Sequence, residues 1–101
     1  MKVFFGDVLD DMVKELRGQA VNNVRLHALY EVEGDVLRIN VHVTTLCNNQ
    51  VYESVVSTKT ALGGATGQKR DELIASACDQ EREKVASRLE GFEVRRGVLQ
   101  E

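Results

Sequence analysis

The stretch Val24–Thr45 constrains the fold most, because its apolar and polar residues alternate along two long arms. Alternation with a period of two is typical of a β-strand that buries one face. Gly34-Asp35 separates the arms and is typical of a two-residue hairpin turn. The stretch therefore predicts one long β-hairpin. Its expected buried residues are Val24, Leu26, Ala28, Tyr30, Val32, Leu37, Ile39, Val41 and Val43.

A two-residue turn also fixes the register of this hairpin, since Glu33 must then face Val36. In that register the apolar faces of the two arms pair as Val32–Leu37, Tyr30–Ile39, Ala28–Val41 and Leu26–Val43. Both faces agree under the same register, and this agreement is independent support for it. The pairs on the polar face are then Glu31–Arg38, Leu29–Asn40 and His27–His42.

The rest of the chain predicts two amphipathic helices and further strands. Apolar residues recur at three- and four-residue steps in both helical segments, which is the spacing of one helix face. If Asn48-Asn49 is a tight turn, Tyr52, Ser54 and Val56 join the buried face of the sheet. The predicted segments are a helix over 7–19, a strand over 51–59, a helix over 68–90 and an edge strand over 92–99. Residues 2–5 form either a strand or an apolar plug under the first helix.

These elements predict one α+β domain over residues 1–101, in the order (β)-α-β-β-β-α-β. We expect an antiparallel sheet of three to five strands with both helices packed on its apolar face. The apolar stripe of the second helix begins at Leu73 and is interrupted by Glu81. We therefore expect that residues 81–89 project beyond the sheet, or that Glu81 meets a partner.

Composition disfavours several classes of function. A net charge of −3 gives no electrostatic footprint for nucleic acid, and no stretch approaches the roughly 18 apolar residues that span a bilayer. The N-terminal residues turn acidic too soon for a secretory signal, so the cytoplasm is the expected location. Cys47 and Cys78 are far apart in sequence and are expected to be unpaired thiols. We find no pattern for a nucleophile with its base, and we expect no catalysis and no cofactor.

The facing pair His27–His42 is the first candidate for chemistry. Two imidazoles about 5 Å apart at their Cβ atoms could share a metal ion. A third ligand would have to come from Glu53, from a chain terminus or from a symmetry-related copy. Since two histidines alone make a poor zinc site, the pair is interpreted as solvent-facing.

A glycine-containing connector is the second candidate. Gly63, Gly64 and Gly67 precede Lys69 and Arg70 at the start of the second helix. Backbone N–H groups at a helix N-terminus, beside these two cations, could hold a phosphate group. The spacing fits neither the Walker motif nor the dinucleotide fingerprint, so a mobile hinge is the alternative interpretation.

The order of helix, three strands, glycine-containing loop and helix resembles the double-stranded-RNA-binding domain. With the leading strand it also resembles the ribosome-hibernation factors of bacteria. This resemblance implies that Lys69 and Arg70 contact RNA phosphates. The acidic turn Glu33-Gly34-Asp35 and the negative net charge differ from the pattern of such domains.

The remaining hypothesis is a protein-binding module. One face of the predicted sheet stays uncovered, and it carries Leu29 and Val55 among polar side chains. We expect a homodimer that packs sheet to sheet, or edge to edge through 94–99, with another protein as the alternative partner. The candidate binding face consists of His27, Leu29, Arg38, Asn40, His42 and Val55.

Overall fold

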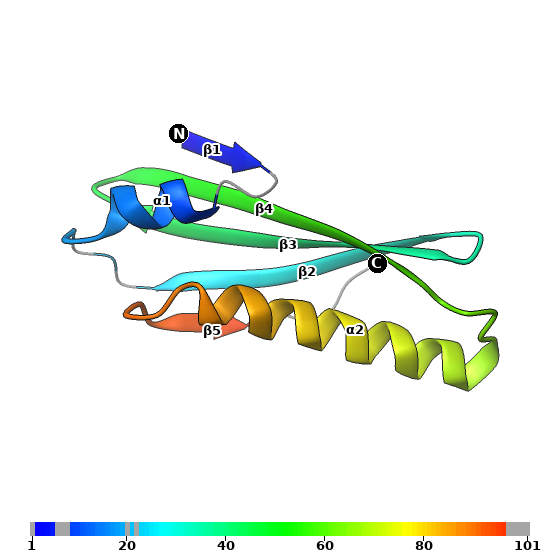
Figure 1. Cartoon of the computed structure of the whole chain (residues 1–101). Helices are drawn as coiled ribbons and strands as arrows, with labels where there is room; N and C mark the ends of the chain where they lie inside the picture. Colours follow the sequence, from blue (N-terminus) through cyan, green and yellow to red (C-terminus); the bar gives the residue numbers. More distant parts are fainter. Residues whose placement is uncertain (1, 6–8, 20, 22, 97–101) are drawn as a thin grey trace.

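A computed structural model describes residues 2–5, 9–19, 21 and 23–96. Three long strands form its centre: β2 (Val24–Glu33), β3 (Val36–Cys47) and β4 (Gln50–Ala61). Each is antiparallel to the next, and the helices are α1 (Leu9–Leu16) and α2 (Gly67–Ser87) (Figure 1). The expected α+β class, with two helices and three antiparallel strands, is confirmed for the described residues.

The hairpin of β2 and β3 has the predicted register. Glu33 pairs with Val36 across the turn, and His27 pairs with His42. Gly34 has a φ of 61°, a left-handed conformation that glycine adopts without a steric penalty. The alternating sequence therefore separates an apolar face from a polar face along the whole hairpin.

A second tight turn, Asn48-Asn49, joins β3 to β4. The two asparagines have φ values of 52° and 62°, and two successive positive φ angles are typical of the type I′ hairpin turn. The register that follows places Tyr52 and Ser54 on the apolar face, where they are 4% and 0% exposed. This is the arrangement that the sequence predicts for a tight turn.

Two short strands border the central three. β1 (Lys2–Phe5) pairs in parallel with β4, and β5 (Val94–Arg96) pairs in parallel with β2, so that the order is β1-β4-β3-β2-β5. The expectation of an antiparallel sheet throughout is wrong at these two edges. At one edge the reason is visible in Figure 1: α2 runs back along the sheet, so β5 starts at the end where β2 starts. Residues 97–99 of the predicted last strand lie outside the described residues.

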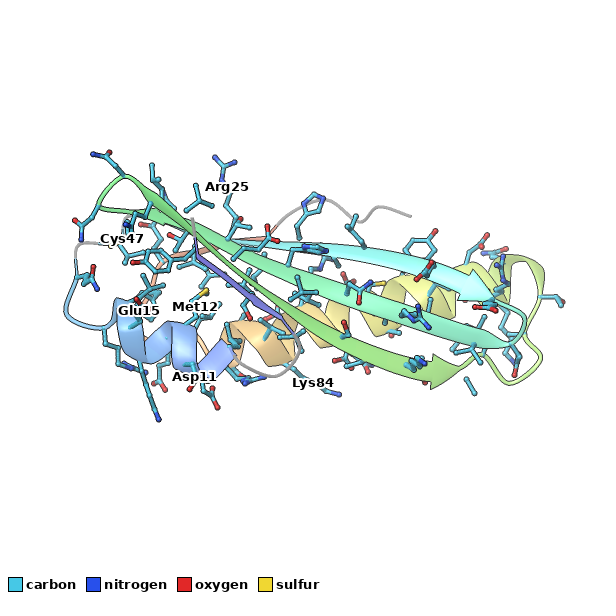
Figure 2. The ribbon with its side chains drawn as sticks, turned by 90° about the horizontal axis from the view of Figure 1, so that it is seen from above. Asp11, Met12, Glu15, Arg25, Cys47 and Lys84 are labelled. Atoms are coloured by element: carbon cyan, nitrogen blue, oxygen red, sulfur yellow. The ribbon has the colours of Figure 1, made fainter. Side chains whose placement is uncertain are left out.

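Both helices pack on the apolar face of the sheet. In Figure 2, Met12 lies between α1 and the sheet, whereas Arg25 points away from the opposite face. The buried apolar residues of the helices and of the sheet face that the helices cover form one continuous cluster. The residues that α1 contributes have the spacing of a single helix face: Leu9, Met12, Val13 and Leu16.

The end of α2 belongs to this core. Val85 is 2% exposed, and Leu89, in the turn after the helix, is 1% exposed. Arg88 in the same turn forms an ion pair with Asp10 of α1, with 3.2 Å between nitrogen and oxygen. The expected projection of residues 81–89 beyond the sheet is therefore wrong, because these residues pack under the sheet beside α1.

The alternative expectation for α2 was a partner for Glu81. Glu81 is partly buried, and its carboxylate lies 3.1 Å from the ammonium group of Lys84 on the same helix. Leu73, expected on the apolar stripe, is instead 41% exposed. The buried stripe of α2 consists of Ile74, Cys78 and Val85, so it is narrower than the sequence pattern suggests.

Candidate functional site: the open face of the sheet

The face of the sheet opposite the helices is called the open face below. Residues of β2, β3 and β4 lie on it in rows that run across the strands, and the register of the two hairpins sets these rows. The four central rows are Arg25–Thr44–Glu53, His27–His42–Val55, Leu29–Asn40–Ser57 and Glu31–Arg38–Lys59. All six residues of the predicted binding face lie in the last three of these rows: His27, Leu29, Arg38, Asn40, His42 and Val55.

The apolar side chains that the sequence predicts on the open face are less exposed than expected. Leu29 is half-buried, and Val55 is only 7% exposed, so Val55 offers little accessible surface. Sequence reasoning missed Leu46 and Val51, which face each other beyond the four central rows and are 59% and 40% exposed. Extending the alternation past Thr45 to a tight Asn48-Asn49 turn would have revealed this apolar pair.

The polar side chains of the open face fall into two groups. Arg38 donates a hydrogen bond to the Glu31 carboxylate at 3.2 Å, and the Ser57 hydroxyl donates to the Asn40 amide oxygen at 2.6 Å. Arg25, Glu53 and Lys59 form no ion pair with any other residue in the described part of the chain. These three charges are therefore available to a partner.

Two shallow hollows open on this side of the sheet, one toward each end of the hairpins. A twisted sheet is saddle-shaped, so each of its faces is concave along one diagonal. One hollow is lined by Glu31, Glu33, Val36, Arg38 and Lys59, and the other by Asn23, Arg25, Thr44, Thr45, Leu46 and Val51. Both hollows combine charged side chains with an exposed apolar one.

The glycine connector lies against the tip of the first hairpin. Gly63, Gly64 and Gly67 all have positive φ angles of 60° to 74°. The Gly64 amide donates a hydrogen bond to the Asp35 carboxylate at 2.9 Å, and the backbone carbonyl of Asp35 accepts one from Leu62 at 2.8 Å. The N–H group of Gly64, which a bound phosphate would need as a donor, is thus already bonded to the Asp35 carboxylate.

The basic residues that follow this connector lie in the first turn of α2. Lys69 is exposed and Arg70 is half-buried, and neither forms an ion pair with another described residue. They lie at the opposite end of α2 from Arg88, which contacts α1. Lys69 and Arg70 follow the connector directly in the sequence, but they lie on α2 and not in the rows that contain the six residues of the predicted binding face.

Metal-ligating and nucleophilic groups are scattered rather than gathered. Within residues 2–5, 9–19, 21 and 23–96, no three His, Cys, Asp or Glu side chains are arranged to hold a metal ion. Cys47 and Cys78 are buried and form no disulfide bond among the described residues, and burial raises the pKa of the Cys78 thiol above its ordinary value. None of the described helices is long and apolar enough to cross a membrane.

No protein-family model, curated protein or solved structure matches this chain. The similarity in element order to the double-stranded-RNA-binding domain is thus not accompanied by a match in sequence or in overall structure. The open face is therefore interpreted from its own geometry and charges.

Proposed function

We propose that the protein is a non-catalytic binding module that associates with a second copy of itself through the open face of its sheet. The size of this face supports the proposal. β3 has 12 residues, so it is about 40 Å long, and three strands are about 14 Å wide. Two such faces bury on the order of 1,100 Å², which reaches the roughly 1,000 Å² that a specific interface needs.

Apolar side chains on the open face give such an association a driving force. Leu46 and Val51 face each other at one end, and Val36 is 44% exposed at the other. Leu29 lies between them and is half-buried. Removing these side chains from water contributes about 25 cal/mol for each Å² of apolar surface.

The observation that carries the proposal is the alternation of charge at the corners of the four central rows. In the first row β2 carries Arg25 and β4 carries Glu53. In the fourth row the signs are reversed, because β2 carries Glu31 and β4 carries Lys59. The two positive charges therefore occupy one pair of diagonally opposite corners, and the two negative charges occupy the other pair.

The four corner charges are self-complementary under a two-fold axis, while Arg38, on β3 between two of them, is paired with Glu31 of its own chain. An axis along β3 places β2 of one copy over β4 of the other, and each row over itself. Arg25 then faces Glu53 of the second copy, and Glu31 faces Lys59 of that copy. A symmetric dimer makes each of these contacts twice, so four attractive pairs would border the interface.

The cytoplasmic location predicted from the sequence remains part of this proposal. Neither Cys47 nor Cys78 forms a disulfide bond within the described residues. Cysteines without disulfide bonds are usual in a reducing compartment, which supports the same location.

Sedimentation equilibrium of the wild-type chain and of charge variants tests the association. Arg25→Glu replaces two attractive contacts per dimer with two repulsive ones, and we expect the dimer dissociation constant to rise about tenfold or more. The double variant Arg25→Glu/Glu53→Arg exchanges the two charges and should restore the wild-type constant.

Arg17→Glu is the matched control, because it makes the same charge change at an exposed residue just after α1 on the helix side. It should leave the dissociation constant unchanged. A wild-type chain that stays monomeric at 100 μM or more, or equal effects of Arg17→Glu and Arg25→Glu, would refute the proposal. If instead RNA co-purifies and is lost only in Lys69→Glu/Arg70→Glu, the RNA-binding alternative is the better one.

A further inference from the structure

The pair His27–His42 lies in the second of the four central rows of the open face. The two histidines are directly opposite each other on β2 and β3, and both are half-buried. Their Cβ atoms are about 5 Å apart, a spacing from which two imidazoles can converge on one metal ion. One chain supplies only these two ligands here, because no third metal-ligating side chain joins them among the described residues.

A second copy would complete the set of ligands. This step rests on the association proposed above, with the two-fold axis along β3, which places the histidine row of one copy over the same row of the other. Sheets that pack face to face lie about 10 Å apart. A metal ion midway between the two sheets would lie about 5 Å from each of them. This distance matches the length of an imidazole side chain together with a metal–nitrogen bond of about 2.0–2.1 Å.

We infer that His27 and His42 are half of a four-histidine site for a divalent transition-metal ion, completed by the same two residues of a second copy. Four imidazoles suit Zn²⁺, which prefers four ligands in a tetrahedral arrangement. Mg²⁺ and Ca²⁺ prefer oxygen ligands, and the histidine row offers none. Glu53, one row away on β4, supplies a carboxylate near the bound charge.

The test is sedimentation equilibrium of the full chain, first stripped with EDTA and dialysed, then with ZnCl₂ or with MgCl₂. We expect Zn²⁺ to lower the dimer dissociation constant at least tenfold and Mg²⁺ to leave it unchanged. Isothermal titration should give one Zn²⁺ for two chains. Co²⁺ in place of Zn²⁺ should give the visible absorption of a tetrahedral nitrogen site.

His42→Asn and His27→Asn should each abolish the tightening by Zn²⁺, measured for each variant as the ratio of its own dimer dissociation constants without and with ZnCl₂. Asn40→His/His42→Asn is a further control, because it keeps two histidines on the face but moves one to the next row. The inference is overturned if Zn²⁺ does not tighten the dimer, if it binds without promoting association, or if its effect survives in the His→Asn variants.

The outcomes also separate this inference from the proposed function. A metal-free dimer that is weakened by Arg25→Glu but unaffected by Zn²⁺ overturns the metal site alone. A chain that stays monomeric with and without Zn²⁺ overturns both. A dimer that forms only with Zn²⁺ and is lost in His42→Asn supports the metal site and makes the metal ion the main source of the association.

Discussion

Leu89→Ala tests whether the end of α2 belongs to the core, as the structure shows. Leu89 is 1% exposed, and replacing such a leucine by alanine costs about 2–5 kcal/mol through lost burial and the cavity that remains. For a chain of 101 residues, a loss of about 3 kcal/mol lowers Tm by roughly 12–24 °C. Urea titration followed by circular dichroism measures the free energy of unfolding directly, at one fixed chain concentration because association stabilises the folded state.

Leu73→Ala is the matched control, since it is the same substitution at a residue of α2 that is 41% exposed. We expect it to cost less than about 1 kcal/mol. If the two variants lose the same small amount of stability, Leu89 does not lie in the core. The interpretation in which residues 81–89 project beyond the sheet would then be correct.

Two further buried groups give predictions. Ser54 is fully buried, and its hydroxyl has no hydrogen-bond partner among the described residues, a situation that costs about 1–3 kcal/mol. Ser54→Ala should therefore leave the free energy of unfolding unchanged or raise it by about 1 kcal/mol in urea titrations. A loss of stability larger than that of Ser57→Ala would contradict this. Burial raises the pKa of the Cys78 thiol from 9.0. The stability that comes from burying the protonated thiol is therefore complete below pH 9.0, and it is lost as the pH rises through the folded-state pKa. Urea titrations between pH 7 and 10 should show this loss in the wild type and a smaller one in Cys78→Ala.

The first hairpin could be predicted residue by residue because two independent constraints agree on it. The two-residue turn at Gly34 sets which residues face each other, and the alternation on both arms requires the same pairing. A shift by one residue would move every apolar side chain to the open face. The pairing of His27 with His42 was therefore available from the sequence.

The second helix could not be predicted as well, because its pattern is ambiguous. Leu73 and Ile74 are adjacent, and both fit a three- and four-residue spacing with the later apolar residues. Only one of them can point at the sheet, and packing selects Ile74, which is 4% exposed. Glu81 interrupts the stripe, yet it pairs with Lys84 of the same helix, and the helix continues to Ser87. The sequence alone gives no means of choosing between these arrangements.

The charge pattern on the open face depends on the turn between β3 and β4 more than on the hairpin before it. Glu53 and Lys59 belong to β4, and a two-residue turn places Glu53 in the row of Arg25. A turn longer by one residue would move both charges to the helix face, where they would be buried without partners. The positive φ angles of Asn48 and Asn49 fix the shorter turn. The complementarity that supports self-association is thus a consequence of the conformation of two asparagines that lie about 30 Å along the strands from the fourth row.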